Sequence, residues 1–160
     1  MHKSDGSATI CGMSRAKELA AKELQRRASK AAAVDRQRYE DRKLHKKAVE
    51  VWSALLLAVE HWVKEYNSPF DTAQAFLRTT ESYEFELIKE ERLQTVAKVH
   101  LNSSIGAIEF ELFRRSGPRA SKPLRTGTFL IQLDSLIDMG SQEPVILEQI
   151  TDTITSAVFG

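Results

Sequence analysis

The feature that most constrains the fold of this chain is the stretch from Leu44 to Tyr66. Apolar residues recur there at steps of three and four, which predicts an α-helix with one buried stripe. Between Ala54 and Val59, apolar side chains face every direction around that helix. Each Leu left in water forgoes about 1.5–3 kcal/mol of burial free energy. We therefore expect this central helix to be covered on two sides, by a sheet and by other helices or a second copy.

Charged residues divide the chain into a basic and an acidic part. The 160 residues carry a formal net charge of +1 at pH 7. Residues 1–47 contain 13 Lys or Arg against 6 Asp or Glu, whereas residues 48–160 contain 10 against 16. The single cysteine, Cys11, excludes an internal disulfide and a cysteine-based zinc site. No stretch approaches the roughly 18 apolar residues of a membrane span, so we expect a cytoplasmic protein with no membrane contact.

The basic part is expected to be a helical arm over residues 14–43, preceded by a disordered leader over residues 1–13 and followed by one α+β domain over residues 44–160. The arm contains no Gly or Pro and is rich in helix-forming residues. Three interpretations stay open: a solvated helical extension, a helix that pairs with a partner or a second copy, and a nucleic-acid binder. The second depends on a narrow apolar seam formed by Ala21, Leu24, Ala28, Ala31, Ala32 and Tyr39.

Beyond Glu81 the apolar period changes from helical to alternating. The alternating segments cover residues 83–87, 97–101, 108–112 and 129–133. One apolar and one polar face per strand is typical of an antiparallel sheet that is covered on one side. If the strands pair in sequence order, opposite charges face each other across them, through Glu84, Glu86, Lys98, His100, Glu109 and Glu111.

Two further helices are expected in the acidic part. Asp71 and Gln74 form a capping-box pattern that predicts a short helix over residues 71–80. A closing helix over residues 144–159 is predicted from Pro144 in its first turn and from a stripe formed by Ile146, Ile150, Ile154 and Val158. The predicted fold class is α+β. It comprises a four-stranded antiparallel sheet with one face covered by the central and C-terminal helices, preceded by the long basic N-terminal helix.

No sequence motif indicates catalysis, a cofactor or a metal ion. The chain contains no glycine-rich phosphate loop, no Gly-x-Ser-x-Gly and no His-Glu-x-x-His. His61 and Glu65 lie one helical turn apart, as metal ligands can, but neither has a further ligand nearby, and a surface ion pair explains them better. We therefore expect neither an enzyme nor a metal or cofactor protein.

One loop has more positive charge than its surroundings. Residues 114–125 carry five basic residues and no acidic residue, in a connection longer than an ordinary hairpin loop. Arginine side chains can bind phosphate or carboxylate groups through two hydrogen bonds. A solvated loop and an anion-binding site are both consistent with the pattern, and the candidate residues are Arg114, Arg115, Arg119, Lys122 and Arg125.

These patterns favour a non-catalytic protein-interaction or assembly protein that associates through its apolar central helix, with itself or with another protein. The candidate interface residues are Trp52, Leu56, Leu57 and Trp62. The alternative is nucleic-acid or polyanion binding through the basic arm and the 114–125 loop. Binding of that kind would be non-specific and would weaken as salt rises.

The sequence also predicts where the folding free energy resides. Because the arm has few large apolar residues, a chain that begins at Arg42 is expected to unfold in one cooperative step. Thermal unfolding followed by circular dichroism at two wavelengths would test this. A truncated chain with no cooperative transition would contradict the assignment of the core to the acidic part.

Overall fold

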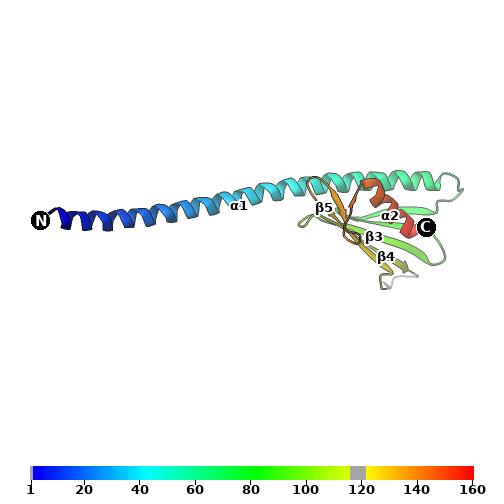
Figure 1. Ribbon diagram of the computed structural model, residues 1–160. Coiled ribbons are helices and arrows are strands. Elements are labelled where there is room, and N and C mark those ends of the chain that lie inside the picture. Colours follow the sequence, from blue (N-terminus) through cyan, green and yellow to red (C-terminus); the bar gives the residue numbers. More distant parts are fainter. Residues whose placement is uncertain (1, 116–121) are drawn as a thin grey trace. The chain divides into compact units, whose positions relative to one another are not determined.

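The computed structural model describes the backbone of residues 2–115 and 122–160 and the side chains of residues 14–115 and 122–160. Residue contacts divide the chain into two units, residues 1–42 and 43–160. The side chains of the predicted leader, residues 1–13, lie outside the described ones. Figure 1 shows the elements, which are α1 (His2–Asn67), β1 (Ala75–Glu81), β2 (Glu84–Lys89), β3 (Gln94–Asn102), β4 (Ala107–Arg115), β5 (Arg125–Ile131), β6 (Leu136–Asp138), β7 (Pro144–Val145) and α2 (Leu147–Phe159).

A single helix, α1, replaces the two helices expected from the sequence, so the prediction of a separate central helix is wrong. The expected division after Lys43 follows a change in charge, and a change in charge does not interrupt backbone hydrogen bonds. No Gly or Pro between residues 14 and 66 provides a break. The helix ends at Asn67, immediately before Ser68 and Pro69, because a proline disfavours the helical conformation of the residue before it.

The predicted helix over residues 71–80 is also wrong, because this segment contains β1. The Asn67 side chain fixes the connection between α1 and β1. Its Oδ1 accepts hydrogen bonds from the backbone N–H groups of Gln74 and Ala75, both at 2.9 Å. Its Nδ2 donates to the carbonyl oxygen of Ala75 at 2.8 Å. The pairing of β1 with β2 thus prevails over the local capping-box signal, as tertiary context commonly does over propensity.

The sheet contains seven strands in the order β1 to β7, all antiparallel to their neighbours, so the predicted four-stranded sheet is wrong. The four predicted strands correspond to β2, β3, β4 and β5. The strand β1 was not expected, because its segment has the local signal of a helix. The strands β6 and β7 were not expected either, and they have only three and two residues. Strands that short do not show an alternating pattern.

The predicted register of the central strands is confirmed. Lys98 of β3 lies between Glu86 of β2 and Glu111 of β4, and His100 lies between Glu84 and Glu109 in the same way. A shift of one residue would move every side chain to the opposite face of the sheet. The observed register therefore keeps the apolar side chains on one face and the charged ones on the other.

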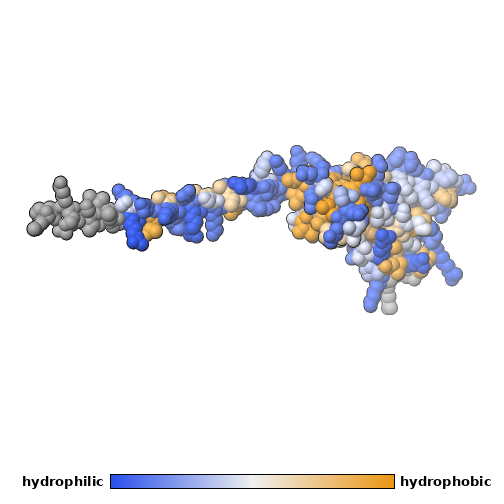
Figure 2. All heavy atoms as spheres, viewed as in Figure 1, coloured by the Kyte–Doolittle hydropathy of each residue, from blue (hydrophilic) through white to orange (hydrophobic). Residues whose placement is uncertain are grey.

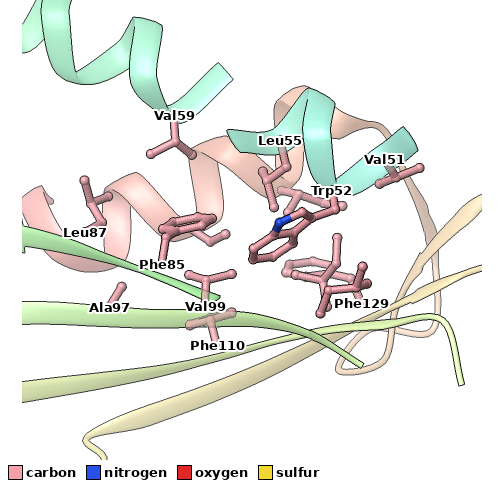
Figure 3. Packing of buried hydrophobic residues seen from close by; sticks show 14 of the residues in the cluster. Val51, Trp52, Leu55, Val59, Phe85, Leu87, Ala97, Val99, Phe110 and Phe129 are labelled. Atoms are coloured by element: carbon pink, nitrogen blue, oxygen red, sulfur yellow. The ribbon is translucent and has the colours of Figure 1, made fainter. Parts of the chain in front are cut away.

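The apolar face of the sheet packs against α2 and against the part of α1 that belongs to residues 43–160. Figure 3 shows Trp52 and Leu55 of α1 above the buried side chains of the strands. The predicted closing helix is confirmed over residues 147–159, and Ile150 and Ile154 are fully buried. Ile146 was expected in the same stripe, but it precedes the first turn of α2 and is 59% exposed.

Gly127 of β5 allows the Phe110 ring of the neighbouring strand to enter the core. It lies directly opposite Phe110 of β4, which is 1% exposed. A Cβ atom built on Gly127 would collide with the Phe110 ring. The missing side chain at position 127 is therefore a packing requirement, because a closely packed core has no free space for a displaced ring.

We expect Gly127→Ala to destabilise the protein by about 1–3 kcal/mol, the usual cost of inserting a methyl group into a packed core. Urea unfolding followed by tryptophan fluorescence would measure the loss. The matched control is Gly140→Ala, since a Cβ atom there would meet only the Asp138 side chain, at 3.3 Å. Equal unfolding midpoints for the two variants would contradict the packing argument.

Candidate protein interface

The predicted interface residues do not form one surface. Trp52 is 3% exposed, and its ring centroid lies 5.3 Å from that of Phe85 in the core. Leu56 is half-buried and packs against the same core. Leu57 is 66% exposed, because successive helix residues point about 100° apart. The surface that a partner could reach therefore includes Leu57 but not Trp52.

Trp62, the fourth predicted interface residue, belongs to a half-buried aromatic cluster. Its ring centroid lies 5.0 Å from that of Tyr66 and 4.8 Å from that of Phe159. Tyr66 also contacts Phe159 and Phe70, at centroid distances of 4.6 and 5.6 Å. The cluster joins the last turns of α1 and α2, so Trp62 helps to hold the two helices together.

Several large apolar side chains are exposed on the predicted helical arm. From here on, the arm means residues 14–42, the described part of it that lies in the first unit. Apart from Glu23, every side chain of the arm is exposed. The large apolar members are 44–66% exposed and comprise Leu19, Leu24, Val34 and Tyr39. On the face seen in Figure 2, small hydrophobic areas interrupt a mostly hydrophilic surface along this segment. They are the large apolar groups that the arm presents at its surface.

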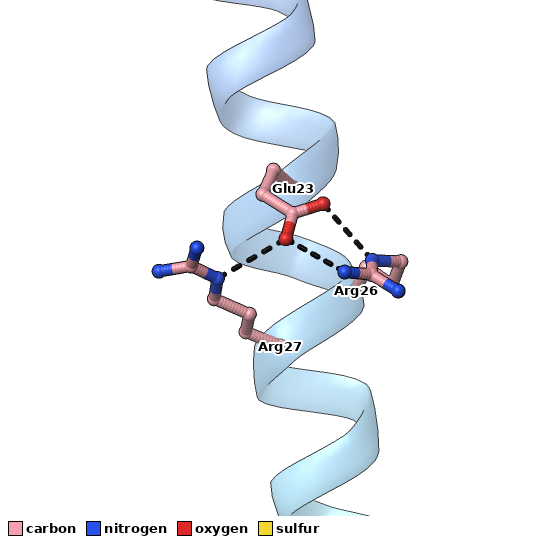
Figure 4. Close-up of polar contacts among 3 residues, drawn as sticks. All are labelled: Glu23, Arg26 and Arg27. Carbon is pink, nitrogen blue, oxygen red and sulfur yellow. Dashed lines mark hydrogen bonds and ion pairs between the residues drawn. The ribbon is translucent and has the colours of Figure 1, made fainter.

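Ion pairs support the helix in the middle of the arm. Glu23 accepts hydrogen bonds from Arg26 at 2.9 and 2.8 Å and from Nε of Arg27 at 3.1 Å (Figure 4). The hydrogen bond from Arg26, and after it the one from Arg27, holds the pKa of the Glu23 carboxyl below its usual value. The hydrogen bond with Glu23 in turn raises the pKa of Arg26. Pairs three and four residues apart stabilise a helix.

A shallow depression of about 430 Å³ lies on the arm over the short side chain of Ala31. Its lining is formed by Arg27, Lys30, Ala31, Val34, Asp35 and Arg38. The apolar seam predicted from the sequence included Leu24 and Ala31 but not Val34. The signal that could have found Val34 is the heptad spacing, since Leu24, Ala31 and Val34 follow one another at steps of seven and three.

The predicted anion-binding residues are distributed over both faces of the sheet. Arg114 and Arg115 are neighbours at the end of β4, so their side chains point to opposite faces. Nη2 of Arg115 lies 3.6 Å from Oε2 of Glu86, an oxygen that is buried and accepts no hydrogen bond from a described residue.

The remaining members of this set lie at the start of β5 and before it. Arg125 is opposite Leu112, and therefore on the same face as Arg114; its guanidinium carbon lies 6.0 Å from the centroid of the Phe110 ring. Lys122 is exposed. Arg119 lies in the stretch 116–121, outside the described residues. The described members of this set do not form one cluster, and the anion site stays a prediction.

The charged face of the sheet carries paired side chains. A hollow of about 820 Å³ opens over β2 and β3 and includes Glu84, Lys98 and His100 in its lining. Lys98 Nζ lies 3.0 Å from Glu84 Oε1, and His100 Nε2 lies 2.7 Å from Glu109 Oε2. Both basic groups of the hollow thus already have acidic partners within the chain.

These contacts shift two pKa values. Burial raises the pKa of the Glu84 carboxyl, but the hydrogen bond from Thr80 and the contacts with Lys98 outweigh it, so the net pKa is lowered. The hydrogen bond with Glu84 raises the pKa of Lys98. Each group thus stabilises the charged form of the other.

The described part of the chain contains neither a metal-binding cluster nor a helix suited to cross a membrane. Among the side chains at positions 14–115 and 122–160, no cluster of three or more His, Cys, Asp or Glu could hold a metal ion. Within the same part of the chain, no helix combines the length and the apolar character that crossing a membrane requires.

No protein-family model, curated protein or solved structure matches this chain. Its candidate function therefore depends on the geometry of its own surfaces.

The Glu84–Lys98 pair makes a prediction about pH. A double-mutant cycle with Glu84→Gln and Lys98→Met should give a coupling free energy of at most about 1 kcal/mol, since Lys98 is 43% exposed. Because the pKa of Glu84 is lowered in the folded protein, this group adds to the free energy of unfolding at pH values above 4.5, its ordinary pKa. That contribution is lost as the pH falls through the lowered pKa. Because the pKa of Lys98 is raised in the folded protein, this group adds to the free energy of unfolding at pH values below 10.5, its ordinary pKa. That contribution is lost as the pH rises through the raised pKa.

Urea unfolding of the four proteins at pH 3, 7 and 11 would follow this coupling, with the expected maximum near neutral pH. Glu65→Gln is the control, since this carboxylate is 68% exposed and pairs with His61, at 3.0 Å, away from the sheet. A coupling that is equal at all three pH values would contradict the assigned charges.

Proposed function

We propose that this protein is a non-catalytic interaction or assembly protein that associates through α1. The observation that carries the proposal is the exposure of Leu19, Leu24, Val34 and Tyr39, between 44 and 66%, on a helical segment with no cover of its own. The sequence favoured association through the centre of the helix. Trp52 and Leu55 are buried in the core there, so the arm is the better contact surface.

The partner that this surface suits is another α-helix. The arm has the depression over Ala31, and two of its exposed apolar residues, Leu24 and Val34, lie at heptad spacing with Ala31. Side chains of a second helix can pack into such a surface as knobs into holes. Polar and charged residues surround this stripe, as they do at the rim of a protein interface.

Substitution of the apolar residues by charge tests the proposal. The double variant Leu24→Glu and Val34→Glu should lose association, because two carboxylates would have to be buried in the contact. Light scattering of the purified protein, from micromolar to millimolar concentration, measures the association. We expect the wild-type chain to exceed the mass of a monomer, through a second copy or through a polypeptide that co-purifies in fixed ratio.

The matched control is Ser29→Glu with Ala33→Glu, which adds the same charge to the same segment away from Leu24 and Val34. This control should associate as the wild type does. Helix content by circular dichroism should be equal in all three proteins. A wild-type chain that stays monomeric and co-purifies with nothing would contradict the proposal. So would equal loss of association in both double variants.

A further inference from the structure

We infer that the free edge of β1 is a docking site for an extended polypeptide segment, which pairs with β1 as an additional strand and places an acidic side chain opposite Arg78. This inference goes beyond the proposed function, because the site includes no residue of the arm. It follows from the direction of the backbone groups of β1, from the Asn67 side chain, and from the charge of Arg78.

The strand β1 lies at one end of the sheet and pairs only with β2. In such a pair, the backbone N–H and C=O groups of successive residues point alternately to the two sides of the strand. The carbonyl group of Gln74 accepts a hydrogen bond from the N–H group of Glu90, at 2.9 Å, and therefore faces β2. Alternation then turns the backbone groups of Ala75, Leu77 and Thr79 away from β2, toward the free edge.

The Asn67 side chain already occupies the first position of this edge. Its amide accepts a hydrogen bond from the N–H group of Ala75 at 2.9 Å and donates one to the Ala75 carbonyl oxygen at 2.8 Å, as a neighbouring strand would. The next backbone groups on this edge belong to Leu77 and Thr79. Within residues 2–115 and 122–160, none of the other residues forms a hydrogen bond with them. A second extended backbone is the partner that matches such a row of donors and acceptors.

The opposite edge of the sheet is less suited to this pairing. It is formed by β7, which has two residues, and the first of them, Pro144, has no N–H group. Short strands and prolines are common means of protecting a sheet edge. The strand β1 has seven residues and no proline, and both Arg78 and Thr79 are exposed. An irregular register between Thr79 and Glu81 limits the usable edge to the part before it.

Arg78 determines the charge of the segment that suits this edge. Its side chain is exposed, and in the described part of the chain no carboxylate forms an ion pair with it. Glu86, which lies opposite Arg78 on β2, is instead 3.6 Å from Arg115. A residue of the added strand directly opposite Arg78 would point to the same face, and an acidic side chain there is favoured.

The residue opposite Leu77 would point to the other face of the sheet. Leu77 is half-buried there and packs against the core, so an apolar neighbour extends the same packing. The segment is therefore expected to contain an acidic residue next to an apolar one. Alternation of apolar and polar side chains is also the pattern of a strand with one covered face.

Selection from a random library identifies such segments. Peptides of about ten residues, displayed on phage, are selected on the full-length chain. We expect the enriched peptides to be rich in β-branched residues, to carry an acidic residue beside an apolar one, and to lack proline in that stretch. Enrichment of basic peptides, or of none, would overturn the inference.

The tightest selected peptide is then labelled with a fluorophore and titrated with the protein. Thr79→Pro removes an N–H group from the free edge but none from the pairing with β2, so the dissociation constant should rise at least roughly fivefold. Thr79→Val, which keeps the N–H group, is the control and should bind as the wild type does. Circular dichroism shows whether each variant is folded.

Methylation of the peptide backbone gives a test that leaves the protein unchanged. A methyl group is placed on one backbone nitrogen at a time. An added strand uses every second N–H group, so affinity should fall at alternate positions of the paired stretch and stay equal between them. Loss at consecutive positions, or at none, would show that the peptide does not pair as a strand.

A charge exchange tests the role of Arg78. The selected acidic peptide should bind Arg78→Glu at least roughly fivefold more weakly than it binds the wild type, and a lysine in place of its acidic residue should restore binding to this variant. Equal affinity of both peptides for both proteins would contradict the assigned position of the acidic residue.

Two further controls separate this site from other contacts. The variant with Leu24→Glu and Val34→Glu should bind the peptide as the wild type does, so failure of association through the arm leaves the inference intact. Loss of peptide binding in this variant would place the site on the arm and overturn the inference. If Thr79→Pro lowered the mass of the protein alone in light scattering, β1 would pair with a second copy, and the assigned partner would be wrong.

Discussion

Burial of the apolar stripe of α1 against one face of the sheet is the interaction on which the rest of the structure depends. Trp52, Leu55 and Val59 are at most 3% exposed, and they meet the alternating apolar side chains of β2 to β5. Since alternate residues of a strand point to opposite faces, this contact decides the environment of every strand residue. It brings Phe85 into the core and directs Glu84 and Glu86 to the other face. The contact covers only part of the all-round apolar stretch of the helix, because Leu55 and Val59 are buried while Ala54 and Leu57 stay exposed.

The two faces of the sheet are stabilised by different kinds of interaction. On the apolar face, close packing sets the limits, and Gly127 must lack a side chain for Phe110 to lie flat across it. On the other face, alternating charges pair across neighbouring strands, with Lys98 and His100 between carboxylates. Half-exposed ion pairs contribute little free energy. They agree with the register that packing selects, because a strand shifted by one residue would turn its charged side chains toward the core and its apolar side chains toward water.

Different interactions stabilise the two parts of α1. Up to Arg42, local interactions such as those of Glu23 with Arg26 and Arg27 are the described contacts that support it. Beyond Lys43, tertiary packing does so as well. An isolated helix of this kind gains stability from a second helix, since its exposed Leu24 and Val34 are then removed from water.

The sequence by itself determined whatever depends on near neighbours in the chain. The helical period predicted the buried stripe of α1 and that of α2, the alternating period predicted β2 to β5, and the charges on Glu86, Lys98 and Glu111 predicted the register. Alternation also implied that Arg114 and Arg115 point apart, although the anion-site prediction did not use it. Only the tertiary structure decided that residues 75–81 form a strand, that β6 and β7 extend the sheet, and that Trp52 is interior. Each of these outcomes depends on partners far away in the sequence, and a local pattern has no information about which surface a side chain will finally meet.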